Sequence, residues 1–142
     1  MLRVILPLVL LSLAFAPAPL PKTPRGQRPD DLARLQGEWV AVRETIGGHQ
    51  FPVRDQVTTI SGRTLRHVIR GQVTATWTID PDPRRAPPRM NQRWKGELLL
   101  SIYRLEGDTL TVSWQNENDA AGWPVDFKGG AGIGVTCFRR KR

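Results

Sequence analysis

The chain contains little of the chemistry that metal-dependent and disulfide-bonded small proteins need. Its 142 residues include one cysteine and two histidines. One cysteine excludes a disulfide within the chain, and with two histidines it leaves too few soft ligands for a structural zinc site. The sequence has no phosphate-binding glycine loop, no Gly-x-Ser-x-Gly elbow and no His-Glu-x-x-His motif. We therefore expect no cofactor and no metal ion, and the length predicts one domain.

Acidic residues are also scarce, since 13 Asp and Glu stand against 21 Lys and Arg and leave a formal charge of +8. With 39% hydrophobic and 24% charged residues, the composition is that of a globular domain and excludes a disordered chain. The basic excess is compatible with nucleic acid or another anionic polymer as a partner. Few aromatic residues lie among the basic ones, so specific nucleic-acid binding is not expected.

Long apolar runs are missing except at the N-terminus, where Val4 to Phe15 follows Arg3 and overlaps the sequence Ala14-Phe15-Ala16. A basic start, a short apolar segment and an A-x-A site predict a signal peptide over residues 1–16. The run is shorter than the ~18–20 residues of a spanning helix, so no transmembrane segment is expected after cleavage. Because Pro17 disfavours cleavage, an uncleaved N-terminal anchor is the alternative. We expect an exported protein of the periplasm or cell envelope.

The rest of the sequence predicts a tether followed by one all-β domain. Residues 17–30 are rich in proline and predict a tether, and the domain is predicted over residues 31–142. Asp30 or Asp31 is expected to cap a short helix that ends at Gln36. Apolar and polar residues then alternate with the period of a strand, most clearly over residues 73–80 and 109–115.

Further strands are expected over residues 39–45, 57–61, 64–70, 98–105 and 133–140. Glu106-Gly107-Asp108 predicts a hairpin turn between two of these segments. Closing seven or eight short antiparallel strands removes exposed sheet edges. The sequence therefore predicts a small up-and-down barrel of about eight strands, preceded by the short helix.

Three segments carry a resemblance to a known family. They are Leu35-Gln36-Gly37-Glu38-Trp39, the hairpin over residues 100–110, and Trp123-Pro124-Val125-Asp126-Phe127, which is expected to be a strand. From about Asp31 onward the chain resembles an uncharacterised family of secreted lipocalin-like domains that is abundant in planctomycete bacteria. The chain has Ser113 and Trp123 where that family commonly has Cys and Arg. The resemblance implies a lipocalin-like barrel and an envelope location, and it implies no biochemical activity.

The same resemblance implies how one end of the barrel is closed. In lipocalin-like barrels the tryptophan of Gly-x-Trp plugs one end, and an arginine of the last strand lies across its indole. The matching residues are Gly37, Trp39 and Arg140, with Arg139 as the second candidate for the arginine.

Strand phase predicts which residues line the barrel interior. Trp77 and Trp114 alternate in phase with aliphatic residues, and His67 is in phase with Leu65. We expect His67 to be the one polar group that could orient a ligand carboxylate or hydroxyl. The predicted lining residues are Leu65, His67, Trp77, Leu100, Ile102 and Trp114.

The sequence offers little for catalysis, and we expect no enzyme. His67 has no carboxylate at strand spacing to orient it as a general base. Asp80 and Asp82 stand in a proline-containing loop with too few oxygens for a calcium site. Cys137 alternates with Ile133 and Val135, which predicts a small core residue rather than a nucleophile.

Three hypotheses about function remain, and the least favoured is an enzyme that would depend on His67 or on the Asp80 and Asp82 loop. The other two are binding or interaction modules. In the first, the protein is a binding module whose barrel interior takes a small apolar or amphipathic ligand. In the second, side chains fill the barrel and the protein is an envelope interaction or structural module that contacts an anionic envelope component. The basic contact surface of the second hypothesis is a proline-rich loop with the residues Arg84, Arg85, Arg89, Arg93, Trp94 and Lys95.

Overall fold

The fold is seen in a computed structural model that describes residues 30–118 and 122–142. The predicted signal peptide and nearly all of the predicted tether lie outside the described residues. One helix, α1 (Asp31–Leu35), precedes nine strands. The strands are β1 (Gly37–Ile46), β2 (His49–Phe51), β3 (Gln56–Ser61), β4 (Thr64–Ile69), β5 (Gln72–Asp82), β6 (Arg89–Trp94), β7 (Glu97–Glu106), β8 (Thr109–Asn116) and β9 (Gly134–Arg140).

Eight of these strands close into an antiparallel barrel, which confirms the predicted fold class. β1 pairs with β3, each strand from β3 to β9 pairs with the next, and β9 pairs back with β1. β2 is the ninth strand and is added beside residues 44–46 of β1. The closed arrangement leaves few free strand edges.

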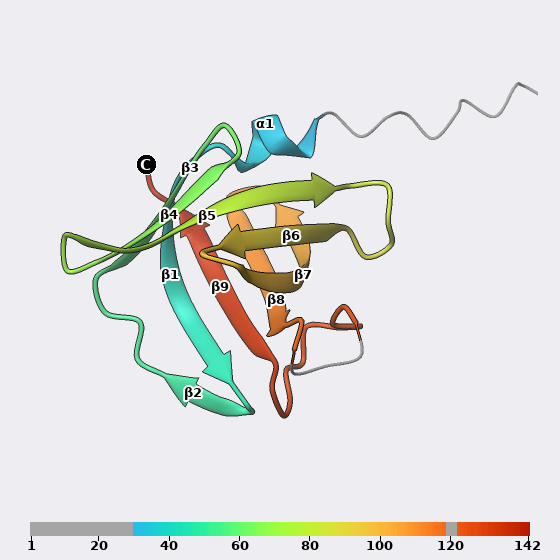
Figure 1. Cartoon of the computed structure of the whole chain (residues 1–142). Coiled ribbons are helices and arrows are strands. Elements are labelled where there is room, and N and C mark those ends of the chain that lie inside the picture. The colour runs from blue at the N-terminus through green and yellow to red at the C-terminus, as the bar shows by residue number, and fades with distance from the viewer. Residues whose placement is uncertain (1–29, 119–121) are drawn as a thin grey trace, which may run out of the picture.

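The two ends of the barrel differ (Figure 1). At one end lie α1 and the β3–β4, β5–β6 and β7–β8 connections, and at the other lie β2 and the β4–β5 and β6–β7 turns. Asp30 caps α1 by accepting a hydrogen bond from the Leu32 N–H at 3.1 Å. Gln36 then exchanges two hydrogen bonds with the Gly62 backbone in the β3–β4 turn, at 2.6 and 3.1 Å. The helix is thereby fixed to the end of the barrel.

The core lies inside the barrel and is concentrated at the α1 end. Side chains of alternating strand residues point inward, as the period of two requires. The buried cluster consists of Leu35, Trp39, Ala41, Ile60, Leu65, Trp77, Ile79, Met90, Tyr103, Leu110, Val112 and Phe138. Tyr103 also donates a buried hydrogen bond to Asp31 Oδ2 at 2.9 Å, which ties the barrel wall to α1.

Several local predictions are corrected by the structure. Residues 123–127 form bends and no strand. Residues 89–94 were expected to be loop and form β6, and the short β2 was not predicted. Val73 was expected to share the inner face with Ala75, yet it is 57% exposed. The register of β4 and β5 shifts between His67 and Val68, and this bulge turns Val73 outward.

Candidate functional site: a cavity inside the barrel

One end of the barrel is sealed by Trp39, which is fully buried. Its indole N–H donates to the Leu35 carbonyl at 2.8 Å. The Arg140 guanidinium lies over the indole, with Cζ 4.1 Å from the ring centroid, and donates to the Gln36 and Arg34 carbonyls, each at 2.6 Å. Arg140 therefore covers the indole and holds the end of α1 at the same time.

Gly37 belongs to this closed end for a steric reason. Its φ is +113°, and a Cβ at this position would lie 3.2 Å from Arg140 Nη1. Only glycine adopts this backbone conformation without strain and leaves room for the guanidinium. The structure thus brings Gly37, Trp39 and Arg140 together.

A cavity of about 480 Å³ occupies the barrel interior on the other side of the core. Its inner part is lined by buried apolar side chains, and its outer part includes Ile69, Thr74 and Glu97, which are exposed. It is therefore a cup, closed by Trp39 and α1 at one end and open at the other. The lining residues are Glu44, Gln56, Thr58, Ile60, Leu65, His67, Ile69, Thr74, Ala75, Trp77, Met90, Gln92, Glu97, Leu99, Leu110, Val112, Trp114, Asn116, Thr136 and Phe138.

Four of the six predicted lining residues border this cavity, namely Leu65, His67, Trp77 and Trp114. Leu100 and Ile102 do not, and this part of the expectation is corrected. On β7 the inward positions are Leu99, Ser101 and Tyr103, so Leu100 and Ile102 are buried on the outer face.

Residues 122–127 cover the outer face of this sheet region. Gln115 donates a hydrogen bond to the Gly122 carbonyl, and Arg89 and Arg104 lie over the rings of Trp123 and Phe127, with Cζ at 4.4 and 4.9 Å from the centroids. Because both faces of β7 are buried, its sequence does not alternate between apolar and polar residues. Strand phase could not tell the two faces apart here.

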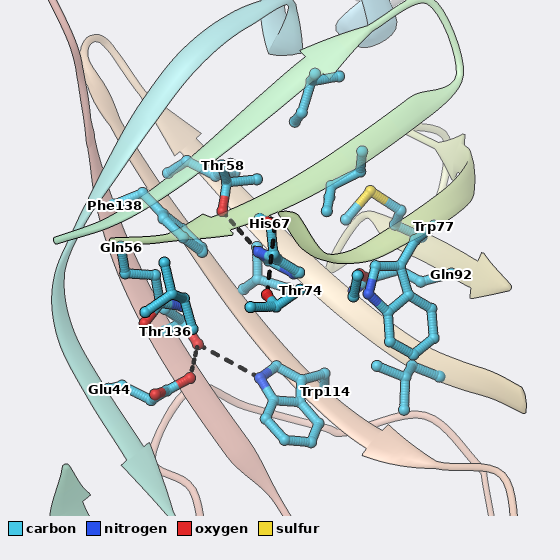
Figure 2. A pocket seen from close by; sticks show the side chains of 18 of the residues that line it. Glu44, Gln56, Thr58, His67, Thr74, Trp77, Gln92, Trp114, Thr136 and Phe138 are labelled. Atoms are coloured by element: carbon cyan, nitrogen blue, oxygen red, sulfur yellow. Dashed lines mark hydrogen bonds between the residues drawn. The ribbon is translucent and has the colours of Figure 1, made fainter. Parts of the chain in front are cut away.

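His67 lies in the cavity wall, half-buried, with Nδ1 2.8 Å from the Thr58 hydroxyl (Figure 2). Burial lowers the pKa of His67 from 6.5 to about 4, because the charged imidazolium would lose its hydration. The imidazole is therefore neutral at pH 7. Its partner is a hydroxyl, so His67 lacks the carboxylate that usually orients a catalytic base.

Glu44 lines the cavity, although it was not among the predicted lining residues. Trp39 and Ala41 point inward, so strict alternation would place Arg43 inside and Glu44 outside. The register between β1 and β9 shifts between Ala41 and Arg43. This bulge turns Arg43 outward and Glu44 into the cavity, where it lies opposite Thr136 on β9. The available signal was that unbroken alternation would have buried an arginine.

The basic residues from Arg84 to Lys95 do not form one loop surface. Arg84 and Arg85 lie after β5 and pair with Asp82 at 3.0 and 3.5 Å. Arg89 and Arg93 are on β6, and Lys95 is in the turn at the open end of the barrel. Trp94 points inward and packs on Trp77, with 5.4 Å between ring centroids, while Lys95 Nζ lies 5.0 Å from the Trp94 ring.

The other candidate chemical groups are engaged elsewhere. Asp80 pairs with Arg63, and the hydrogen bond from Arg84 lowers the pKa of Asp82. Cys137 was predicted to be a small core residue. It is instead half-buried on the outer face of β9, where it accepts a hydrogen bond from Arg43 at 3.4 Å.

Within the described ranges, no three His, Cys, Asp or Glu side chains are grouped so that they could hold a metal ion. None of the helices in these ranges is long and apolar enough to cross a membrane.

Comparison of the chain with known proteins identifies no family. No family model, no curated protein and no solved structure matches the chain. What is established is the architecture itself, an all-β closed barrel of eight antiparallel strands with one short helix before it.

Proposed function

We propose that this protein is a small-molecule-binding module whose barrel interior takes one apolar or amphipathic ligand. The observation that carries the proposal is the cavity of about 480 Å³, closed at one end and open at the other. Ligand sites of small molecules commonly have volumes of about 300–1,000 Å³ with mostly apolar walls and a few placed polar groups. The walls here are built in this way, with His67 and Glu44 among the polar groups.

The alternative is an interaction module with a barrel filled by side chains and a basic contact surface. Two observations favour the binding module over it. The barrel interior holds a cavity, and the basic residues of the supposed surface lie along the whole of β6 and in both flanking connections. Arg84 and Arg85 are already paired with a carboxylate. We propose no catalytic activity, since the imidazole in the cavity is hydrogen-bonded to a hydroxyl.

Filling the cavity with a larger side chain is expected to abolish binding. Ala75 lines the cavity and Thr76, the next residue, is exposed on the outside of the same strand. A neutral environment-sensitive dye, N-phenyl-1-naphthylamine, should gain fluorescence with the wild-type protein and with the control Thr76→Leu. The gain should fall at least about tenfold with Ala75→Leu. Equal gains with Ala75→Leu and Thr76→Leu, or no gain with folded wild-type protein, would refute the binding module.

We also propose that the protein is exported and belongs to the secreted lipocalin-like domains that its sequence resembles. Support comes from residues 1–16, which have the basic start, apolar segment and A-x-A site of a signal peptide. Fractionation of cells that carry a C-terminally tagged copy should place the protein in the envelope or outside the cell. Changing the apolar segment with Leu10→Arg should keep the tagged protein in the cytosol. Full-length wild-type protein in the cytosol would count against export.

A further inference from the structure

We propose that the cavity selects a small apolar amine, bound as an organic cation whose charge lies against the carboxylate of Glu44. This inference rests on the proposed binding function and names the chemical class of its ligand. It also replaces the sequence-based idea that His67 orients a ligand carboxylate.

The charges of the cavity wall have the opposite sign to those of the whole chain. The formal charge of the chain is +8, yet among the described residues that line the cavity there are two carboxylates, Glu44 and Glu97, and neither Lys nor Arg. His67 adds no positive charge at pH 7, since burial lowers its pKa to about 4. Exposed charges, including Glu97 and Lys95 at the open end, are screened within about 8 Å at physiological salt, so the half-buried Glu44 carboxylate dominates inside the cavity.

Glu44 has acceptor capacity that the protein does not use. Its Oε1 accepts a hydrogen bond from the Thr136 hydroxyl at 3.3 Å, and that hydroxyl accepts one from the Trp114 indole N–H at 3.4 Å (Figure 2). In residues 30–118 and 122–142, no Lys or Arg forms an ion pair with Glu44. The carboxylate is half-buried, held in place through Thr136, and open to a donor from a ligand.

The walls next to Glu44 also suit a cation with an apolar body. Figure 2 shows the indole of Trp114 beside Thr136, which also bonds to Glu44, and Trp77 lines the same cavity. Indole faces attract organic cations. Deeper in the cup the wall is aliphatic and aromatic, with Leu65, Leu110 and Phe138. A ligand with an amine at one end and an apolar body would therefore place the body toward the closed end and the ammonium beside Glu44.

Desolvation gives the direction of the selectivity. Any ligand that fills the cup removes water from the Glu44 carboxylate, and this costs free energy unless a new partner replaces the water. An ammonium group supplies charge-assisted hydrogen bonds. A neutral end supplies none, and a ligand carboxylate adds repulsion between like charges. The expected order of affinity is ammonium, then neutral, then carboxylate.

Three matched dyes test this order. Each is a dansyl amide with a short alkyl arm that ends in an ammonium, a methyl or a carboxylate group. At pH 7 the ammonium dye should bind the wild-type protein about tenfold or more tightly than the methyl dye, and the carboxylate dye should bind more weakly still. Glu44→Gln keeps an oxygen that accepts from Thr136 and removes the charge, so the ammonium and methyl dyes should then bind about equally.

The control variant is Glu106→Gln. Glu106 is an exposed carboxylate at the closed end of the barrel, where it pairs with Arg104 at 3.4 Å. The dye preference of this variant should equal that of the wild type, and circular dichroism checks that both variants are folded. If the methyl dye binds but the carboxylate dye binds as tightly as the ammonium dye, the inference is wrong and the binding module stands. If no dye binds the folded wild-type protein, both are wrong.

Discussion

Replacing Trp39 with alanine is expected to lower the free energy of unfolding by about 3–5 kcal/mol, the usual cost of removing a large buried aromatic side chain. Trp39 is completely buried and donates a hydrogen bond to the Leu35 carbonyl, so its loss opens a hole beneath α1 and breaks the contact to the helix. Urea denaturation of the wild type and of Trp39→Ala measures the difference. An unchanged free energy of unfolding would show that Trp39 does not close the barrel.

Arg140 and its neighbour Arg139 provide a matched pair for the same end of the barrel. Arg140→Ala removes the cation from the Trp39 indole and two hydrogen bonds to the Arg34 and Gln36 carbonyls at the end of α1, and is expected to cost about 2 kcal/mol. Arg139 is exposed on the outer face of β9, and Arg139→Ala is expected to change stability by less than about 0.5 kcal/mol. Equal losses from both substitutions would argue against a special role for Arg140.

The folded protein is expected to lose stability as the pH falls from about 6.5 to about 4, in part because of His67. In the folded state the pKa of His67 is lowered to about 4, whereas the unfolded chain protonates near 6.5. Between these values the unfolded state binds more protons, so stability rises with pH across this window. The shift corresponds to a contribution of about 3 kcal/mol that is present above pH 6.5 and lost below pH 4.

Denaturation at a series of pH values with His67→Gln isolates this contribution. The amide can replace the hydrogen bond to Thr58 and does not titrate, so the variant should lose less stability than the wild type between pH 6.5 and 4. His49→Gln, on the exposed strand β2, is the control and should keep the wild-type pH dependence. Parallel curves for wild type and His67→Gln would contradict the buried, neutral imidazole.

The fold was largely predictable because most strands have one face toward the core and one toward solvent, so their apolar and polar residues alternate. On β5 the sequence alternates between threonine and apolar residues up to Asp80, and the Glu106-Gly107-Asp108 turn fixed one hairpin. Two strands escaped prediction for physical reasons. β2 is only three residues long. β6 does not alternate between apolar and polar residues, because its inward Gln92 is polar and is accommodated inside the barrel by a hydrogen bond to Ser101.

The cavity was predictable only in part, because bulges and covered faces break the period of two. The bulge after Ala41 places Glu44 inside, and the bulge next to His67 turns Val73 outward. Leu100 and Ile102 are buried on the outer face, which residues 122–127 cover, so they are as apolar as inward residues. Alternation in the sequence predicts which residues share a face of a regular strand, whereas bulges and covered faces depend on contacts between distant segments.

The most direct test of the account asks whether a ligand enters the barrel. The chain has two methionines, Met1 and Met90, and Met90 is fully buried in the cavity wall. In protein labelled with ¹³C-methyl methionine, the Met90 methyl signal should shift when N-phenyl-1-naphthylamine is added. It should also show a nuclear Overhauser effect to this dye. The shift of Met90 should persist in Thr76→Leu, and Ala75→Leu should suppress it. A dye that binds while the Met90 signal stays unchanged would place the binding site outside the barrel and contradict the account.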